Sequence, residues 1–260
     1  GTVTNVSEGT VGNDIQSYAI TRNGVDVTGE YTVTTENGTL EIKQRDVTLT
    51  SGTDSKKYDG TPLTKNVVEV GGDGFVAGEG ATYNVTGSQT LVGNSNNKFT
   101  YELNRGTDAG NYKITPYEGT LTVTDVNVDK DKVITKTLDN EPEDKVAFKV
   151  GETIEWEVKV VNIYDEAKTI TLTEQAGVVL DKSIFENVAP GAIVTANASK
   201  VVTEADILAA ASSGNKYTNV VTAEFEGGIT IDNDNDDAEL ENPDPELTVT
   251  KTSDIPEGVK

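Results

Sequence analysis

Short alternating runs of apolar and polar residues dominate the first half of the chain. The alternation is clear in residues 31–35, 39–43, 47–51 and 121–124. Side chains two positions apart share one face of a strand, so these runs predict half-buried β-strands. Gly, Asn and Asp separate the runs, and the Asn-Gly pair within Arg22–Val25 predicts a tight hairpin turn.

The second half shows a β pattern in longer runs, together with one helix. The strands expected there cover residues 146–150, 153–161, 168–174, 193–197 and 217–225. Thr203–Asp206 has the form of a capping box and precedes an alanine-rich apolar run, which predicts a helix at about 204–212. The fold class is therefore all-β, with tandem small β-sandwich, Ig-like or β-grasp-like modules in an elongated array and one short helix.

The single tryptophan, Trp156, lies within the longest of these runs. It shares a strand face with Ile154, Val158 and Val160. An aromatic residue among such neighbours is typical of a sandwich core, so we interpret Trp156 as a core anchor rather than as a platform for a ligand.

Internal repeats divide the chain. Residues 10–42 recur in outline as residues 91–123, since both copies begin near Val-Gly-Asn and close near Gly-Thr-Leu. The sequence pattern changes after Asp125, where the charged connector Val126–Lys132 begins. We therefore expect four segments, which are the end of one repeat (1–46), a complete repeat (47–125), a larger sandwich unit (126–245) and the start of the next such unit (246–260).

A shorter motif supports the last boundary. Val133–Thr137 returns almost letter for letter as Thr248–Thr252. In both copies a lysine, Lys136 or Lys251, stands two places after a β-branched residue and so shares its strand face. If the β-branched residue points into a core, the lysine does too.

Charge and composition limit the classes of function that the chain can have. The formal net charge is −23, from 44 Asp and Glu against 21 Lys and Arg. Such a chain repels polyanions, so we expect no binding of nucleic acid. No apolar run approaches the roughly 20 residues that a membrane helix needs, so no membrane insertion is expected either.

The chain contains no His and no Cys. This excludes Ser-His-Asp and Cys-His nucleophile systems, as well as His-based and thiolate metal sites. Acidic residues are plentiful, but no pair of them stands in a motif that defines a glycoside hydrolase. We therefore expect the chain not to be an enzyme and to need no cofactor.

Strand parity places three polar residues on inward faces. Lys136 follows Ile134 by two positions, Glu174 ends the apolar face of 168–174, and Asn219 stands among the apolar odd positions of 217–225. A desolvated lysine can lose its proton and become a nucleophile, and a buried carboxylic acid can polarise a carboxamide and shuttle protons. We hypothesise a self-formed isopeptide bond between Lys136 and Asn219, promoted by Glu174. The alternative is that each is a strand-end side chain that reaches water or satisfies a backbone group.

The first half of the chain contains the segments Lys56–Thr64, Gly72–Gly80 and Asn111–Ile114 followed by Gly119–Leu121. On these segments, residues 1–125 resemble the MBG-type repeats of large Firmicutes surface proteins. This resemblance implies tandem extracellular repeats without catalysis.

Five segments of the second half carry a further resemblance: Thr135–Thr137, Val150–Trp156, Val188–Gly191, Val202–Asp206 and Tyr217–Val220. On these segments, residues 132–237 are similar to Ig-like conserved repeats of bacterial envelope proteins, a domain type of unknown function. The order lysine, acid, amide also resembles Gram-positive pilin and adhesin domains, in which the lysine is on the first strand and the amide on the last. This resemblance implies the cross-link proposed for Lys136, Glu174 and Asn219.

The acidic stretch Ile231–Asp237 allows two interpretations. Alternating side-chain oxygens could bind calcium, although the stretch lacks the central glycine and the bidentate glutamate of an EF-hand loop. A solvated, charge-extended linker is the favoured interpretation. Glu241–Pro245 is then a stiff spacer before the next repeat.

Two functional classes follow. The favoured one is a structural stalk or spacer segment of a cell-wall-anchored bacterial adhesin or fibrous surface protein, with neighbouring repeats of the same chain as its partners and any host or cell-surface ligand bound by other domains. The other is a carbohydrate- or protein-binding module. Sugar platforms need exposed rings, and only 15 aromatic residues are present (Tyr 9, Phe 5, Trp 1), which favours the structural class.

Overall fold

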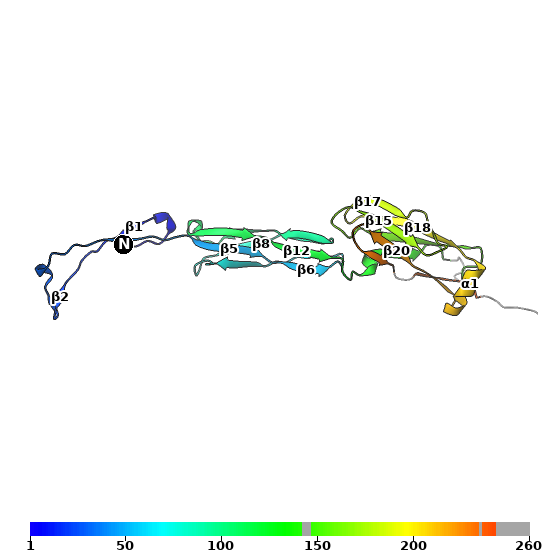
Figure 1. Cartoon of the computed structure of the whole chain (residues 1–260), viewed down its shortest axis with the longest axis horizontal. Helices are drawn as coiled ribbons and strands as arrows, with labels where there is room; N and C mark the ends of the chain where they lie inside the picture. The colour runs from blue at the N-terminus through cyan, green and yellow to red at the C-terminus, as the bar shows by residue number, and fades with distance from the viewer. Residues whose placement is uncertain (142–146, 234–235, 243–260) are drawn as a thin grey trace, which may run out of the picture. The chain divides into compact units, whose positions relative to one another are not determined.

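The computed structural model describes residues 1–141, 147–233 and 236–242. The chain forms two compact units, one made of residues 1–56 and 61–124 and the other of residues 57–60 and those from Asp125 onward. Figure 1 shows that strands are the main regular element of both units, with the short helix α1 (Glu204–Ala210) in unit 2. The all-β prediction is confirmed, and in the described residues no helix is long and apolar enough to cross a membrane.

The first 44 residues of unit 1 form two thin ribbons. Strand β1 (Val11–Asn13) pairs with β4 (Gly38–Leu40), and β2 (Thr21–Arg22) pairs with β3 (Val25–Asp26). The predicted hairpin turn is confirmed, since Asn23 and Gly24 both have positive φ, as a two-residue hairpin requires. The short 3₁₀ turns here are η1 (Val6–Glu8) and η2 (Thr28–Glu30).

No residue from 1 to 44 is buried. The strand predicted at 31–35 is absent, although its alternation is clear. A strand of this kind gains stability from the face against which it packs. Because these residues lack such a face, the alternating pattern alone does not produce a strand.

The rest of unit 1 has a hydrophobic core, which contains Val47, Leu49 and Tyr112. One sheet has the order β11 (Tyr112–Tyr117), β5 (Arg45–Ser51), β7 (Val68–Gly72), and a second has the order β6 (Asp54–Lys57), β12 (Gly119–Thr124), β9 (Gly93–Asn97). A ribbon of β8 (Ala81–Val85) and β10 (Phe99–Leu103) and a turn, η3 (Ala109–Asn111), complete the unit.

Alternation fixes the inward face of these strands. Val47, Leu49 and Ser51 of β5 are buried while the intervening residues are not, and Leu121 and Val123 of β12 are buried in the same way. The strands predicted at 47–51 and 121–124 are therefore confirmed, together with the face that each buries.

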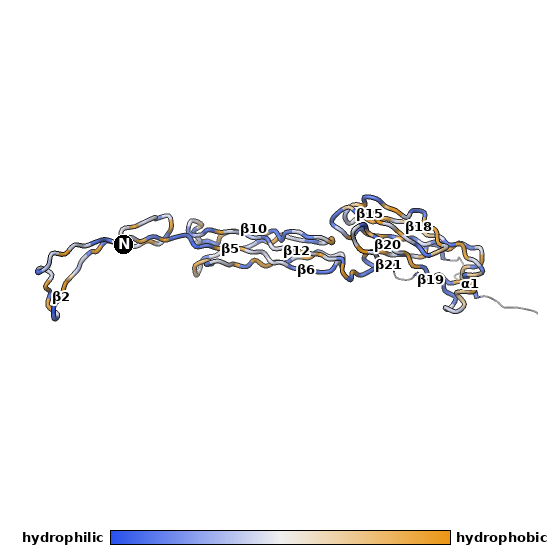
Figure 2. Tube along the Cα trace, viewed as in Figure 1, coloured by the Kyte–Doolittle hydropathy of each residue, from blue (hydrophilic) through white to orange (hydrophobic). Residues whose placement is uncertain are grey.

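Unit 2 is a sandwich of two four-stranded sheets. The first has the order β13 (Ile134–Leu138), β14 (Thr153–Val161), β18 (Ile193–Val201), β16 (Val179–Leu180), and the second has the order β17 (Ile184–Val188), β15 (Lys168–Glu174), β20 (Val221–Phe225), β21 (Thr230–Asp232). A third element is a ribbon of β19 (Lys216–Asn219) and β22 (Asp236–Glu239). Figure 2 shows apolar and polar residues alternating along these strands.

The inner faces of the two sheets meet in a dry core. Ile154, Trp156, Val158 and Val160 of β14 are all 0% exposed, which confirms Trp156 as a core anchor. A turn, η4 (Lys130–Lys132), leads into β13. The predicted helix is α1 (Glu204–Ala210), continued by η5 (Ala211–Ser213), and its predicted capping box is present.

Two strand predictions in unit 2 need correction. Of the strand expected at 146–150, Val146 lies outside the described residues, and the remainder contributes only an isolated bridge from Phe148 to Leu240. The strand expected at 217–225 is interrupted at Val220, so that β19 pairs with β22 while β20 belongs to the second sheet. The odd-numbered residues nevertheless face inward on both sides of this break.

Candidate functional site

Lys136 projects inward from β13, as predicted. In this strand Ile134 and Lys136 are buried, while Thr135 and Thr137 on the other face are exposed. The Lys136 side chain is 0% exposed, and its Nζ lies 2.7 Å from Glu174 Oε1. The same nitrogen stands 4.8 Å from the centroid of the Trp156 ring. The ammonium group is therefore shielded from solvent, with the Glu174 carboxylate and the face of the Trp156 ring beside it.

Glu174 is the last residue of β15 and comes from the opposite sheet. Its side chain is only 3% exposed, so it is inward rather than at the rim. It stands opposite Val221 of β20 in the strand register. The ion pair with Lys136 thus joins the two sheets of the sandwich through its interior.

Asn219 is the last residue of β19 and is 0% exposed. It precedes Val221, the partner of Glu174, by two residues. Its carboxamide lies close enough to Glu174 to oppose the upward shift of that residue's pKa, although no hydrogen bond of good geometry joins them. The structure therefore brings Lys136, Glu174 and Asn219 together around the Glu174 carboxyl group.

Burial favours the neutral forms of the ionisable pair. It lowers the pKa of Lys136 and raises the pKa of Glu174, and their mutual ion pair opposes both shifts. A proton transfer from Lys136 to Glu174 would leave an amine and a carboxylic acid with no net charge in the dry interior. Those are the protonation states in which an amine is a nucleophile and an acid can donate to a carboxamide.

Unpaired polar atoms gather at this place. Among the described residues, six buried side-chain nitrogen or oxygen atoms have no hydrogen-bond partner, and five of them belong to Trp156, Glu174, Asn219 and Asp236. Each orphaned buried group costs roughly 1–3 kcal/mol. Buried polar groups without a partner are uncommon in folded proteins, so this concentration makes the cluster a candidate functional site.

Asp236 was missed by the reasoning from sequence, which assigned it to an acidic linker. It is the first residue of β22 and stands opposite Asn219. A signal was available, because Asp236 alternates with Ala238 and Leu240, and both of these are buried. The continuing alternation predicts a strand with Asp236 on its inner face.

The acidic stretch Ile231–Asp237 is largely strand, so its interpretation as a solvated linker is wrong for the described part. Asp232 accepts a hydrogen bond from the Thr222 hydroxyl and Asp237 accepts one from the Thr218 hydroxyl. Asp234 and Asn235 lie outside the described residues, as do Lys251 and the segment 246–260. Within the part that the structure describes, no group of three or more acidic side chains could hold a metal ion.

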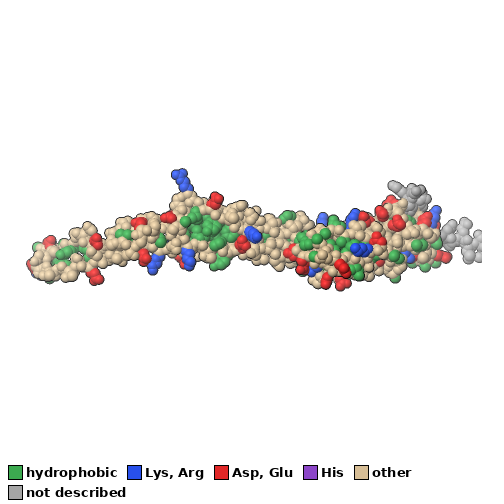
Figure 3. Space-filling model, turned by 90° about the horizontal axis from the view of Figure 1, so that it is seen from above, with side chains coloured by type: hydrophobic (Ala, Val, Ile, Leu, Met, Phe, Trp, Pro, Cys, Tyr) green, Lys and Arg blue, Asp and Glu red, His purple; other side chains and the backbone are tan. Residues whose placement is uncertain are grey.

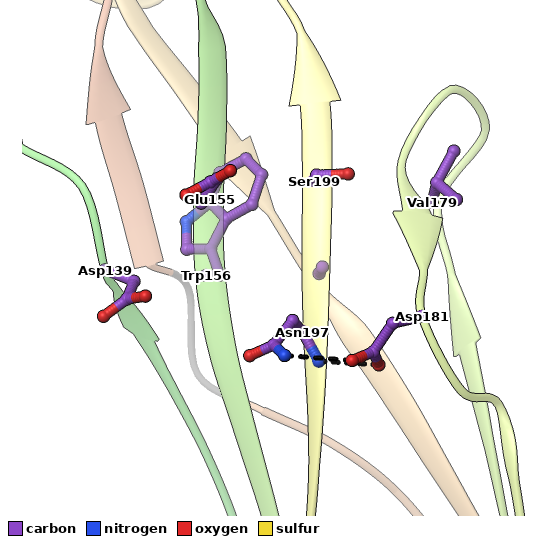
Figure 4. A pocket seen from close by; sticks show the side chains of 8 residues that line it. Asp139, Glu155, Trp156, Val179, Asp181, Asn197 and Ser199 are labelled. Carbon is purple, nitrogen blue, oxygen red and sulfur yellow. Dashed lines mark hydrogen bonds between the residues drawn. The ribbon is translucent and has the colours of Figure 1, made fainter.

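A polar hollow of about 470 Å³ opens on the outer face of the first sheet (Figure 4). Its lining includes Asp139, Glu155, Asp181 and Asn197, and the Asn197 carboxamide donates to Asp181 at 2.9 Å. Trp156 also borders it, but this residue is 0% exposed and offers no ring to a ligand. The hollow therefore lacks the exposed aromatic face that sugar binding usually uses.

No known protein family and no curated protein matches the chain. Among solved structures, the chain is similar to the D00-D0 domain of Intimin, with a TM-score of 0.33 and 12% identity over 75% of this chain and 100% of that one. It is also similar to a FixG-related protein from Vibrio parahaemolyticus, with a TM-score of 0.28 and 15% identity over 44% of this chain and 99% of that one. Similarities this weak do not establish a shared function.

Proposed function

We propose that the chain is a structural stalk or spacer segment of a bacterial cell-surface protein, an adhesin or a fibrous surface protein, and that unit 2 seals itself with an amide bond between Lys136 and Asn219. Glu174 promotes the reaction. The catalysis is a single intramolecular turnover, so the chain is not an enzyme in the usual sense.

One observation carries this proposal. A lysine ammonium and a carboxylate, 0% and 3% exposed, form an ion pair in the core beside a buried carboxamide that has no hydrogen-bond partner in the described structure. Burying an ion pair in a sandwich core is weak evidence of stabilisation, because apolar residues fill such space at lower cost. A reactive site explains why this core keeps three polar groups.

The wider role follows from the resemblances to surface-protein repeats. MBG-type and Ig-like envelope repeats imply an extracellular, cell-wall-anchored array in which neighbouring repeats are the partners. A strongly acidic surface agrees with a soluble spacer, and acidic side chains are scattered over the face of unit 2 drawn in Figure 3. Any host ligand would be bound by other domains of the same protein.

A second candidate function is a carbohydrate- or protein-binding module. The observation that favours it is a hollow of about 260 Å³ on the β8–β10 ribbon, which is lined by the cross-strand pair Tyr83 and Tyr101 together with Thr82, Asn84, Thr100 and Glu102. Both tyrosines are partly buried against the core of unit 1, which limits the ring surface that they offer. Specific binding on a glycan array would support this function over the structural one.

The intact mass of the folded, purified chain tests the cross-link. The wild-type protein should be lighter than its sequence by one ammonia molecule, and Glu174→Gln should keep the full mass of its own sequence because the proton shuttle is lost. Glu166→Gln is the matched control. Glu166 forms another close Lys–Glu pair, with Lys168 at 2.6 Å, but its side chain is 67% exposed, so this variant should lose ammonia as the wild type does. A wild-type chain with its full mass would refute the proposal.

A further inference from the structure

The residue opposite Asn219 defines an additional part of the site. Strands β19 and β22 are antiparallel, and their register pairs Asn219 with Asp236. Directly opposed residues in such a pair project from the same face, with Cβ atoms about 4.5–5.5 Å apart. The Asp236 carboxyl group therefore lies on the Asn219 side of the ribbon.

Asp236 is half-buried, and like Glu174 it has one carboxyl oxygen without a partner in the part of the chain that the structure describes. Its Oδ2 atom is buried and has no hydrogen-bond partner among the described residues. Burial raises the pKa of Asp236, while the backbone N–H of Leu138 and the charge of Lys136 oppose that shift. Leu138 follows Lys136 by two residues on β13, so Asp236 faces the strand that carries the nucleophile.

The site therefore contains two acids and one amine. With Lys136 charged and both acids ionised, the interior would hold one unbalanced negative charge, which is costly in a dry environment. Protonation of one acid removes this cost. Glu174 is the ionised partner, because its Oε1 lies 2.7 Å from Lys136 Nζ. Asp236 is then the acid that remains protonated, and a protonated carboxyl group is a hydrogen-bond donor.

We propose that Asp236 is a second acid of the cross-linking reaction and donates a hydrogen bond from its protonated carboxyl group to the Asn219 side-chain oxygen. This inference rests on the proposed function. A donor at that oxygen stabilises the negative charge that develops when the carboxamide is attacked. Asp236 thus activates the electrophile, and Glu174 activates the nucleophile.

The reaction exchanges one C–N bond for another and conserves every proton. The Lys136 ammonium gives one proton to Glu174, the amine attacks Asn219 Cγ, and the electron pair of the C=O bond moves to the oxygen that Asp236 contacts. When the carbonyl re-forms, the bond from Cγ to Nδ2 breaks. Of the three protons of the ammonium group, one stays on the new amide, one passes through Glu174 to the leaving ammonia and one remains on Glu174. Asp236 keeps its proton throughout.

Time-resolved mass spectrometry of the full chain tests this role. The chain is made by cell-free translation, quenched in denaturant at intervals, and monitored for the loss of ammonia. Asp236→Leu removes the donor and should slow the loss about 10²-fold. Asp236→Asn keeps an N–H donor and should react within about tenfold of the wild type. Asp237→Asn changes the neighbouring residue, which is bonded to Thr218 instead, and should match the wild type.

The dependence of the rate on pH separates a donor from a merely structural residue. The charged groups that act on Asp236 are Lys136 and Asp237, and Glu174 is the ion-pair partner of Lys136. Because the active form of Asp236 is protonated and its pKa is raised, the wild-type rate should fall as pH rises through that pKa. Asn at position 236 does not titrate, so Asp236→Asn should lose this fall.

Several results would overturn the inference. A wild-type rate in Asp236→Leu would do so, and so would loss of water in place of ammonia, which would make Asp236 the acyl group that joins Lys136. If Asp236→Leu fails to fold, as reported by Trp156 fluorescence, an unchanged fall at high pH in Asp236→Asn would still refute the role. A wild-type chain that never loses ammonia would instead refute the cross-link itself.

Discussion

Replacing Asn219 by Leu should lower the free energy of unfolding of unit 2 by about 4–5 kcal/mol, with a fall in Tm of roughly 15–25 °C. The variant keeps the ion pair between Lys136 and Glu174 and removes only the group that Lys136 would attack. Trp156, buried and the only tryptophan, reports the unfolding of this unit by its fluorescence.

The expected size comes from the covalent loop. A bond between residues 136 and 219 closes a long segment of the unfolded chain and removes much of its conformational entropy, as a disulfide of that span would. Leucine and asparagine have the same number of side-chain heavy atoms with the same branching, so the side chain itself adds only a modest packing cost.

The sign of the effect distinguishes the two accounts of the site. Without a cross-link, Asn219 is a buried carboxamide with no hydrogen-bond partner among the described residues, and its replacement by Leu should be neutral or stabilising. Asn219→Asp is the chemical control, because a carboxyl group can still form the bond, with the loss of water in place of ammonia. That variant should keep most of the wild-type stability.

When the two ends of the full chain are pulled apart, a segment of unit 2 should not extend in the wild-type protein. In the cross-linked protein, residues 137–218 lie within the covalent loop and cannot extend. Asn219→Leu should therefore lengthen the total extension by roughly 280 Å relative to the wild type, at about 3.4 Å for each released residue. Single-molecule force spectroscopy measures this difference directly.

The wild type should nevertheless show a short unfolding event from unit 2. Strands β20, β21 and β22 follow Asn219 and lie outside the loop, so load still passes through them. The proposed cross-link would consequently protect the segment between Lys136 and Asn219 rather than the whole unit. Equal extensions for wild type and Asn219→Leu would contradict the account, and Glu166→Gln should match the wild type.

Much of the site could be predicted from strand parity alone. Lys136 and Glu174 alternate with apolar neighbours, so their inward orientation is encoded locally and the structure bears it out. Asn219 keeps the inward parity of its run even though that run divides into β19 and β20. The alternation of apolar and polar residues therefore predicts which side chains are buried, even where consecutive strands belong to different sheets.

What could not be predicted depends on contacts between distant residues. The division of 217–225 follows from the pairing of β19 with β22, a strand that the run of acidic residues concealed. The alternation at 31–35 indicates a strand, but it has no buried face to complete it in this structure. The proximity of Lys136 to Glu174 joins two sheets, and local periodicity contains no information about that distance.

The most direct test of the central claim is peptide mapping of the folded wild-type protein. Trypsin cuts after lysine and arginine but not after an acylated lysine, so the cross-link should yield one branched peptide that joins residues 133–145, uncut at Lys136, to residues 217–251. Fragmentation should place the junction between Lys136 and Asn219, with the loss of one ammonia molecule. Recovery of these two segments as separate linear peptides, with cleavage after Lys136, would contradict the account.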